Sequence, residues 1–265
     1  MKKLFAIVLA ALMVMSMVAC GNSADSADSA DDGAMTYAVE AGSAGEAIAT
    51  ENGWTVNSVA SMADALMEVA SGNSSAAIID LLMAGAMIGE GTSYPNLTYT
   101  DALNSEEYGV GCRKGSDLPS FINSVFAETY ASGKMEEVAT VYGVQESLVE
   151  QAACEFVAAE ESDVAYVQEK GVLLVGITDF APMDYKDENG EWIGFDADMA
   201  KIVAEELGVA VEFVEIDWDS KIMELDSKNI DVVWNGMTLT DEVKGAMDCS
   251  VPYCNNAQVV VVAGE

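Results

Sequence analysis

The sequence predicts an α/β fold with mostly parallel sheets, divided into two lobes. Short apolar runs rich in β-branched residues are typical of buried parallel strands, and helical patterns alternate with them along the chain. The length of 265 residues and a hydrophobic content of 51% predict a substantial core, enough for one large or two small domains. In the C-terminal part the expected strands are residues 172–177, 210–216, 230–234 and 259–263.

The N-terminal part repeats this alternation. Two longer helices are expected at residues 118–131 and 134–142, the second ending at Gly143. The stretch from 145 to 163 is rich in Glu and Ala, and we expect it to contain helix. Shorter strands are expected at residues 37–40, 54–59 and 76–80, followed by helices that begin near Gly45, Met62 and Leu81.

Residues 1–20 have the pattern of an export signal. Lys2 and Lys3 precede an apolar run that is too short to span a membrane as a helix, and the run ends in a lipoprotein-type box at Cys20. Met17 departs from the Leu usual in that box, so an ordinary secretory signal cut after Ala19 is the alternative. Residues 21–34 repeat Ser, Ala and Asp, a composition typical of a flexible tether.

The charge and the missing histidines exclude several classes of function. A formal net charge of -34 is incompatible with nucleic-acid binding, which requires a basic surface, and it suits an extracellular protein. The chain has no His, so His-based triads, general bases and zinc sites are excluded. An enzyme would need other means of catalysis. We expect no metal, no cofactor and no catalysis.

The cysteines other than Cys20 leave two alternatives. Cys112, Cys154, Cys249 and Cys254 show no Cys-x-x-Cys spacing. One disulfide, such as Cys249 with Cys254, is possible, but the favoured interpretation is a set of buried thiols that act as small hydrophobic groups.

The segment from Asp187 to Asp196 imitates part of a calcium loop. The first position of such a loop is held here by Tyr185, which cannot bind calcium through a carboxylate. Asn189-Gly190 is instead typical of a hairpin turn. The sequence therefore predicts a hairpin and no calcium site.

Four motifs carry a resemblance to a known family. They are Gly176-Ile-Thr-Asp-Phe-Ala-Pro-Met, Gly194-Phe-Asp-Ala-Asp-Met, Asn235-Gly-Met-Thr-Leu-Thr and Ala41-Gly-Ser-Ala-Gly-Glu. The chain resembles the extracellular solute-binding proteins of the polar amino-acid ABC uptake family, which are periplasmic-binding-protein-like. The resemblance implies two lobes joined by two crossover strands.

The order of the motifs is swapped relative to that family. Residues 35–107 resemble the second lobe, and 108–149 the returning crossover strand and the closing helices of the first lobe. A joint at 150–163 spans the point where the family has its termini, and 164–265 resemble the first lobe with the outgoing crossover strand. We interpret this order as a circular permutation, which nearby surface termini permit; fusion of two truncated copies is the alternative.

The resemblance also implies a ligand site. Ser43, Ala44 and Gly45 open a helix after a strand, where N–H groups bind a carboxylate, although a plain helix cap is the alternative. Asp80 ends a strand and would pair with the ligand ammonium; its alternative role is to cap the helix at Leu81.

Further positions complete the implied site. Phe180 and Trp218 would sandwich the ligand side chain, and Asn235, Gly236 and Thr238 would contact its polar groups. Val243 stands where the family has an arginine for the ligand carboxylate. Neighbouring Lys244 would point about 100° away on a helix. Ile177 replaces an acidic residue of some members, which weakens a lysine or arginine assignment, although Glu40, Asp179 and Asp80 leave negative charge nearby.

The resemblance implies capture of a small polar amino acid or related zwitterion and its delivery to an ABC permease. The protein would be a monomer, lipid-anchored to the outer face of the cytoplasmic membrane. The alternatives are a sensory or scavenging receptor without an importer and, less favoured, a dehydratase-like enzyme on this fold. The identity of the ligand stays open.

Overall fold

The computed structural model describes residues 35–264, which belong to one compact unit. The expected export signal, the lipid-attachment residue Cys20 and the tether lie outside the described residues. Among residues 35–264, none of the helices has the length and apolar character needed to traverse a membrane.

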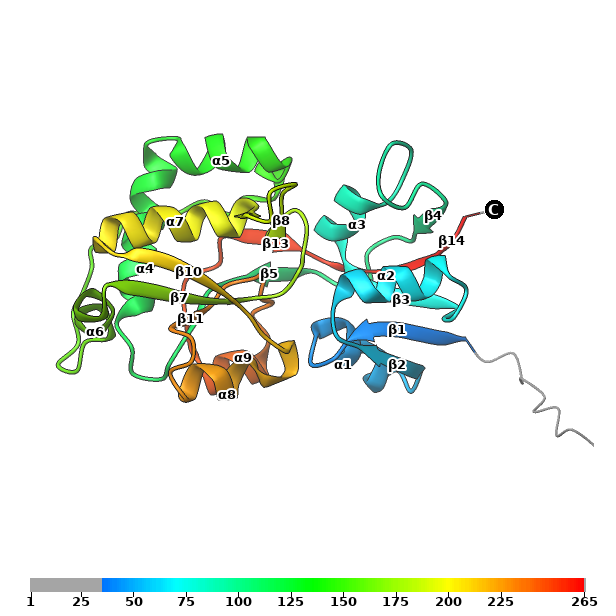
Figure 1. Ribbon diagram of the computed structural model, residues 1–265, viewed down its shortest axis with the longest axis horizontal. Helices are drawn as coiled ribbons and strands as arrows, with labels where there is room; N and C mark the ends of the chain where they lie inside the picture. The colour runs from blue at the N-terminus through cyan, green and yellow to red at the C-terminus, as the bar shows by residue number, and fades with distance from the viewer. Residues whose placement is uncertain (1–34, 265) are drawn as a thin grey trace, which may run out of the picture. The chain divides into compact units, whose positions relative to one another are not determined.

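The second lobe is built on a five-stranded sheet with the order β2-β1-β3-β14-β4. β1 pairs in parallel with β2 and β3, while β14 runs antiparallel to β3 and β4. The ends of the described chain therefore share one sheet, and Figure 1 shows β1 (blue) and β14 (red) in the same lobe. The elements are β1 (Thr36–Glu40), α1 (Ala44–Glu51), β2 (Thr55–Val59), α2 (Met62–Ala70), β3 (Ala76–Asp80), α3 (Leu81–Met87), β4 (Leu97–Tyr99) and β14 (Gln258–Ala263).

The first lobe has a second five-stranded sheet, with the order β10-β7-β11-β6-β12. β7 pairs in parallel with β10 and β11, whereas β6 is antiparallel to β11 and β12. Its strands are β6 (Gly111–Cys112), β7 (Val172–Ile177), β10 (Ala210–Glu215), β11 (Val232–Val233) and β12 (Asp248–Cys249). Its helices are α4 (Leu118–Ala131), α5 (Lys134–Tyr142), α6 (Asp163–Lys170), α7 (Phe195–Leu207), α8 (Lys221–Asp226) and α9 (Asp241–Ala246), with 3-10 turns η1 (Gln145–Ser147) and η2 (Trp218–Ser220).

Two strands connect the lobes. β5 (Glu106–Tyr108) leads from the second lobe into β6, and β13 (Cys254–Asn256) leads from the first lobe into β14. They pair with each other in antiparallel register, with Tyr108 opposite Cys254. The pair of crossover strands expected from the sequence is therefore present, and Figure 1 shows both running between the two sheets.

The expected strands and helices are largely confirmed, but the joint is not helical. α4 and α5 have the predicted bounds, and the α5 helix ends at Gly143 in the left-handed conformation. Between η1 and α6 the chain has no helix. Its backbone is instead bonded to neighbouring segments: the N–H of Val149 donates to Tyr253 O, and that of Ala159 to Asp117 Oδ2. These partners replace the hydrogen bonds that a helix would supply. The helix predicted from the Glu and Ala content is therefore absent between η1 and α6.

The hairpin and two of the four thiols agree with the favoured interpretations. Cys112, Cys154, Cys249 and Cys254 are all free, and Cys112 and Cys254 are buried as expected. Cys154 is exposed, because it lies in the non-helical joint, and Cys249 in β12 is only partly buried. The calcium-like segment forms the hairpin of β8 (Tyr185–Lys186) and β9 (Trp192–Ile193), with Gly190 at φ 82° in its turn.

Candidate ligand-binding cleft

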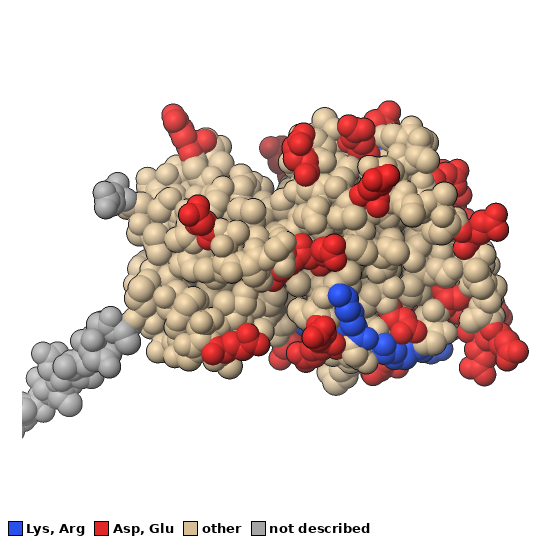
Figure 2. All heavy atoms as spheres, turned by 180° about the vertical axis from the view of Figure 1, so that it is seen from behind, with Lys and Arg blue, Asp and Glu red and all other residues tan. Residues whose placement is uncertain are grey.

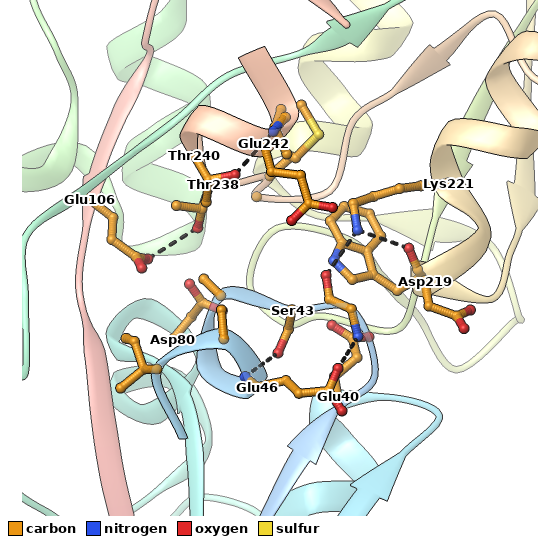
Figure 3. A pocket seen from close by; sticks show the side chains of 18 of the residues that line it. Glu40, Ser43, Glu46, Asp80, Glu106, Asp219, Lys221, Thr238, Thr240 and Glu242 are labelled. Atoms are coloured by element: carbon orange, nitrogen blue, oxygen red, sulfur yellow. Dashed lines mark hydrogen bonds between the residues drawn. The ribbon is translucent and has the colours of Figure 1, made fainter. Parts of the chain in front are cut away.

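A cleft of about 790 Å³ lies where the two lobes meet. Its walls come from the carboxyl ends of β1 and β3, the start of α1, and the crossover strand β5 on one side. The other side is formed by η2, α8, the loop after β11 and the start of α9. Figure 3 shows Asp80 and Glu106 on one flank, Lys221 and Asp219 on the other, and Ser43 between them. The carboxyl ends of parallel strands are the usual place for ligands in α/β folds.

The start of α1 presents hydrogen-bond donors to the cleft. Ser43 is the N-cap, and its Oγ accepts from the N–H of Glu46 at 3.1 Å, so the predicted cap is confirmed. The hydroxyl proton of Ser43 stays free to donate. In the described chain no acceptor is bonded to the N–H groups of Ala44 and Gly45. A helix start of this kind favours a carboxylate.

Glu46 completes the cap in a different way from a standard capping box. Its carboxylate accepts from the N–H of Gly42 at 2.7 Å instead of from that of Ser43. The N–H of Ser43 is already bonded to Glu40 O at 3.2 Å, which explains the difference. One donor near this helix start is therefore occupied by the protein's own carboxylate.

Asp80 does not cap the helix that follows it. It stands at the N-cap position of α3 without a side-chain cap hydrogen bond. Its Oδ1 instead accepts from Tyr108 Oη at 2.7 Å, from Gln258 Nε2 at 3.0 Å and from Asn256 Nδ2. Three donors from the crossover strands and β14 thus fix this carboxylate at the floor of the cleft.

Asp80 has a neighbouring carboxylate in Glu106. Glu106 Oε2 accepts from Thr238 Oγ1 at 3.1 Å and from Asn256 and Gln258, so the two acids share two amide donors. Burial, and secondly the charge of Glu106, raises the pKa of Asp80 to about 8. A cation entering the cleft would relieve this repulsion.

Glu40 is a third buried acid at the cleft. It ends β1 and is 1% exposed. Burial raises its pKa to about 8, the charge of Asp80 adds to the increase, and Thr178 and Lys221 oppose it. Two carboxylates at the ends of neighbouring strands therefore both favour the protonated state when no cation is present.

The loop after β11 contributes mostly backbone atoms and one hydroxyl. Asn235 lines the cleft, but its side chain exchanges hydrogen bonds with Thr178. The N–H of Gly236 donates to Asp196 Oδ2 at 2.6 Å. Thr238 lines the cleft and donates to Glu106. The side-chain amide of Asn235 and the N–H of Gly236 thus bond within the first lobe. Thr238 bonds instead to the buried carboxylate of Glu106.

Only one of the two predicted aromatic residues lines the cleft. Trp218 lines the cleft with 7% of its surface exposed. Phe180 is fully buried and does not line the cleft, because its ring packs beneath Gly236, where an added Cβ would lie 2.4 Å from Phe180 Cε1. Gly45 is also absent from the cleft surface, since a Cβ there would meet Ile78 O at 2.9 Å. Both residues support the walls of the cleft.

No arginine reaches the cleft within the described chain, as the substitution at Val243 predicts. Val243 is 6% exposed and lines the cleft, while Lys244 is exposed and points elsewhere. The basic residue that does line it is Lys221 of α8. Its Nζ donates to Gly42 O at 2.9 Å and to Trp218 O at 3.0 Å, so it connects the two lobes.

Glu106 and Lys221 line the cleft but were not predicted from the sequence. Lys221 lies three residues after Trp218, one helical turn further, and this spacing was the available local signal. Glu106 is the first residue of the crossover strand β5 and has no such signal. Acidic residues predominate around the cleft, namely Glu40, Glu46, Glu51, Asp80, Glu106, Asp219, Asp241 and Glu242.

The acidic character extends over the visible surface. Figure 2 shows acidic side chains spread over this face of the protein and basic side chains confined to a short strip. The field around the cleft therefore attracts cations and repels anions, most strongly at low ionic strength.

Comparison with known proteins finds a family match for the C-terminal part of the chain. Residues 173–265 match the family model of the bacterial extracellular solute-binding proteins, family 3. Over this segment the chain is similar to that family. The segment contains β7, α7, the loop after β11 and the crossover into β14, and so much of the first-lobe wall of the cleft.

Curated relatives match over a similar length. The L-cystine-binding protein TcyJ of Escherichia coli K12 is 38% identical over 96 residues, 36% of either chain. The arginine-binding extracellular protein ArtP of Bacillus subtilis is 37% identical over 35% of this chain and 36% of its own. A cyclohexadienyl dehydratase of Pseudomonas aeruginosa is 31% identical over 39% of either chain. The match spans little more than a third of each relative.

Among solved structures, an ancestral cationic amino-acid solute-binding protein is 44% identical over 31% of this chain and 36% of its own, with a TM-score of 0.30. The two-lobed α/β architecture described above is periplasmic-binding-protein-like, with two sheets joined by two crossover strands. Relatives of the matched segment include amino-acid-binding proteins and a cyclohexadienyl dehydratase.

Proposed function

We propose that this protein captures a small amino acid or related zwitterion between its two lobes and delivers it to an ABC importer. The observation that carries the proposal is the cleft itself. One helix start with free donors at Ser43 and Ala44 faces buried carboxylates at Asp80 and Glu106. An α-carboxylate and an α-ammonium are the two groups that such a pair of sites recognises.

The lobes are suited to closing around a ligand. Asp80 and Glu106 attract a cation strongly only when water is excluded, because the interaction weakens in a high dielectric. Lys221 already contacts Gly42 across the cleft. Closure would then bury the ligand between donors and acceptors from both lobes.

A thermal-shift screen of residues 35–265 against amino acids tests this function. A ligand present at 100 times its dissociation constant adds about 2.7 kcal/mol to the free energy of unfolding, so the melting temperature rises by several degrees. Glycerol and a dicarboxylic acid are controls that lack an ammonium. If none of the amino acids raises the melting temperature, the proposed function is wrong.

We also propose that the protein catalyses no reaction. One observation favours the enzymatic alternative: Glu40 and Asp80 have pKa values of about 8, so each is protonated at neutral pH and suited to donate a proton. Against it, the acidic cleft disfavours an anionic substrate. Incubation with prephenate, followed for loss of water from the substrate, separates the two; product formed above the rate of the protein-free buffer supports a dehydratase.

The swapped order of the two blocks supports a circular permutation. β14 lies in the second-lobe sheet with β3 between it and β1. The joint of residues 150–163 runs within the first lobe. A chain rebuilt with β14 linked directly to β1 and opened in the joint should therefore fold and bind the same ligand. Loss of folding in that chain would favour fusion of two truncated copies.

Lipid anchoring at Cys20 would hold the protein at the outer face of the membrane, close to the permease. Stable anchoring of this type depends on acyl chains attached at the cysteine. Cys20→Ala is therefore expected to release the protein into the medium or periplasm or to leave it unprocessed, as measured by fractionation and mass spectrometry. Unchanged membrane retention of a processed variant would contradict this proposal.

A further inference from the structure

Glu40 is a buried acid without a cation partner. Its Oε1 is inaccessible to solvent and, within residues 35–264, has no hydrogen-bond donor. The residue lines the cleft and is 1% exposed. An unsatisfied buried polar atom costs free energy, and a ligand group that bonds to it would remove this cost.

Lys221 does not satisfy Glu40. The Lys221 ammonium donates to the carbonyls of Gly42 and Trp218, and among the described residues it forms no ion pair within 4.0 Å. Thr178 of the first lobe and Lys221 oppose the rise in the Glu40 pKa but do not cancel it. Glu40 therefore lines the cleft without an ion-pair partner among residues 35–264.

Glu40 and Asp80 form two separate positions for positive charge. β1 and β3 are parallel neighbours, with Ala38 beside Ala77, and continuing this register places Glu40 beside Ile79. Successive residues of a strand point to opposite faces, so Glu40 and Asp80 leave the edge of the sheet on opposite faces. They are therefore separate positions for a cation, although the charge of Asp80 still raises the pKa of Glu40. A ligand with two cations separated by several bonds can reach both.

We propose that Glu40 is a second anionic subsite and that the ligand carries two cationic groups, one at Asp80 and Glu106 and one at Glu40. This inference rests on the proposed binding function and names the class of ligand for the same cleft. The acidic lining with Lys221 as its basic residue agrees with a doubly cationic ligand. Such a ligand is either an amino acid with a cationic side chain or a diamine.

Titration calorimetry with matched ligands tests the subsite. Lysine and norleucine differ by the terminal amine, and arginine and citrulline differ by one charge at nearly equal shape. We expect the cationic member of at least one pair to bind wild-type protein about 30-fold or more tightly than the neutral member. Cadaverine, which is lysine without its carboxylate, distinguishes the two ligand classes. Affinity equal to that of lysine identifies a diamine as the ligand, and weaker binding than lysine identifies an amino acid.

Glu40→Gln identifies the residue responsible. Glutamine has nearly the shape of the protonated acid, so the variant should fold, and it should bind both members of each pair within a factor of about three. The control Glu188→Gln removes one charge from the exposed turn between β8 and β9 and should keep the wild-type preference.

The outcomes separate this inference from the proposed function. Equal affinity of wild-type protein for both members of each pair, or a preference for the neutral member, overturns the subsite but leaves amino-acid binding intact. A Glu40→Gln variant that keeps the full preference for the cation also overturns it. Absence of binding by every amino acid overturns the proposed function, and a diamine that still binds would support the two-cation subsite alone.

Discussion

Asp80→Asn is expected to weaken ligand binding by about 2 to 5 kcal/mol, the usual cost of removing one partner of a buried charge pair. Asp80 accepts hydrogen bonds from Tyr108, Asn256 and Gln258 on one oxygen, which holds its carboxylate in the cleft. The asparagine keeps the size of the group but loses the charge that an ammonium requires. Binding should therefore suffer far more than folding.

The measurement is a titration followed by tryptophan fluorescence, because Trp218 lines the same cleft. Asp101→Asn is the control: it removes one charge from an exposed position of the second lobe and should bind like wild type. The melting temperature of the unliganded Asp80→Asn protein should be unchanged or higher. Wild-type affinity in the variant would leave the start of α1 as the supported part of the site.

The pH dependence of Asp80 gives a second measurement. The folded pKa of about 8 lies above the ordinary value of 3.8, so the unliganded protein loses stability as the pH rises between these values. A bound cation favours the ionised form, and binding then releases a proton. Affinity should consequently increase with pH between about 6 and 8, and this slope should be smaller in Asp80→Asn because Glu40 alone then contributes.

Local patterns in the sequence predicted most elements of the fold, and long-range contacts explain what they missed. The bounds of α4 and α5 follow from apolar spacing and from Gly133 and Gly143, which adopt left-handed conformations at the ends. The joint before α6 has a helical composition, yet its N–H groups find partners on α4 and next to β13. Composition cannot reveal such partners.

The same distinction applies to the site. Ser43 was found from a local pattern, because a cap and its helix are adjacent in sequence. Glu106 was missed, since its role depends on Gln258, which is 152 residues away. Phe180 was expected in the cleft, but Gly236 approaches its ring so closely that the side chain is covered. An aromatic side chain next to a loop is assigned to core or site only when its neighbours are known.

Gly42→Ala is expected to weaken ligand binding by about 1 to 3 kcal/mol, the usual cost of forcing one carbon into a packed contact. Gly42 lies in the loop before α1, and a Cβ there would come within 2.7 Å of Asp219 Cα in the first lobe. The same loop receives the hydrogen bond from Lys221. A methyl group at this point therefore keeps the lobes apart where they meet.

Gly53→Ala is the matched control for backbone strain. Gly42 and Gly53 have nearly equal positive φ values of 71° and 68°, but a Cβ at Gly53 has no neighbour within 4 Å. Alanine in this conformation costs roughly 1 to 2 kcal/mol of folding stability at either position. Both variants should then melt at a lower temperature, while Gly42→Ala alone loses affinity in calorimetric titrations. Equal affinities for the two variants would show that the lobes hold the ligand without this close approach, and that the contact between Gly42 and Asp219 has no part in closure.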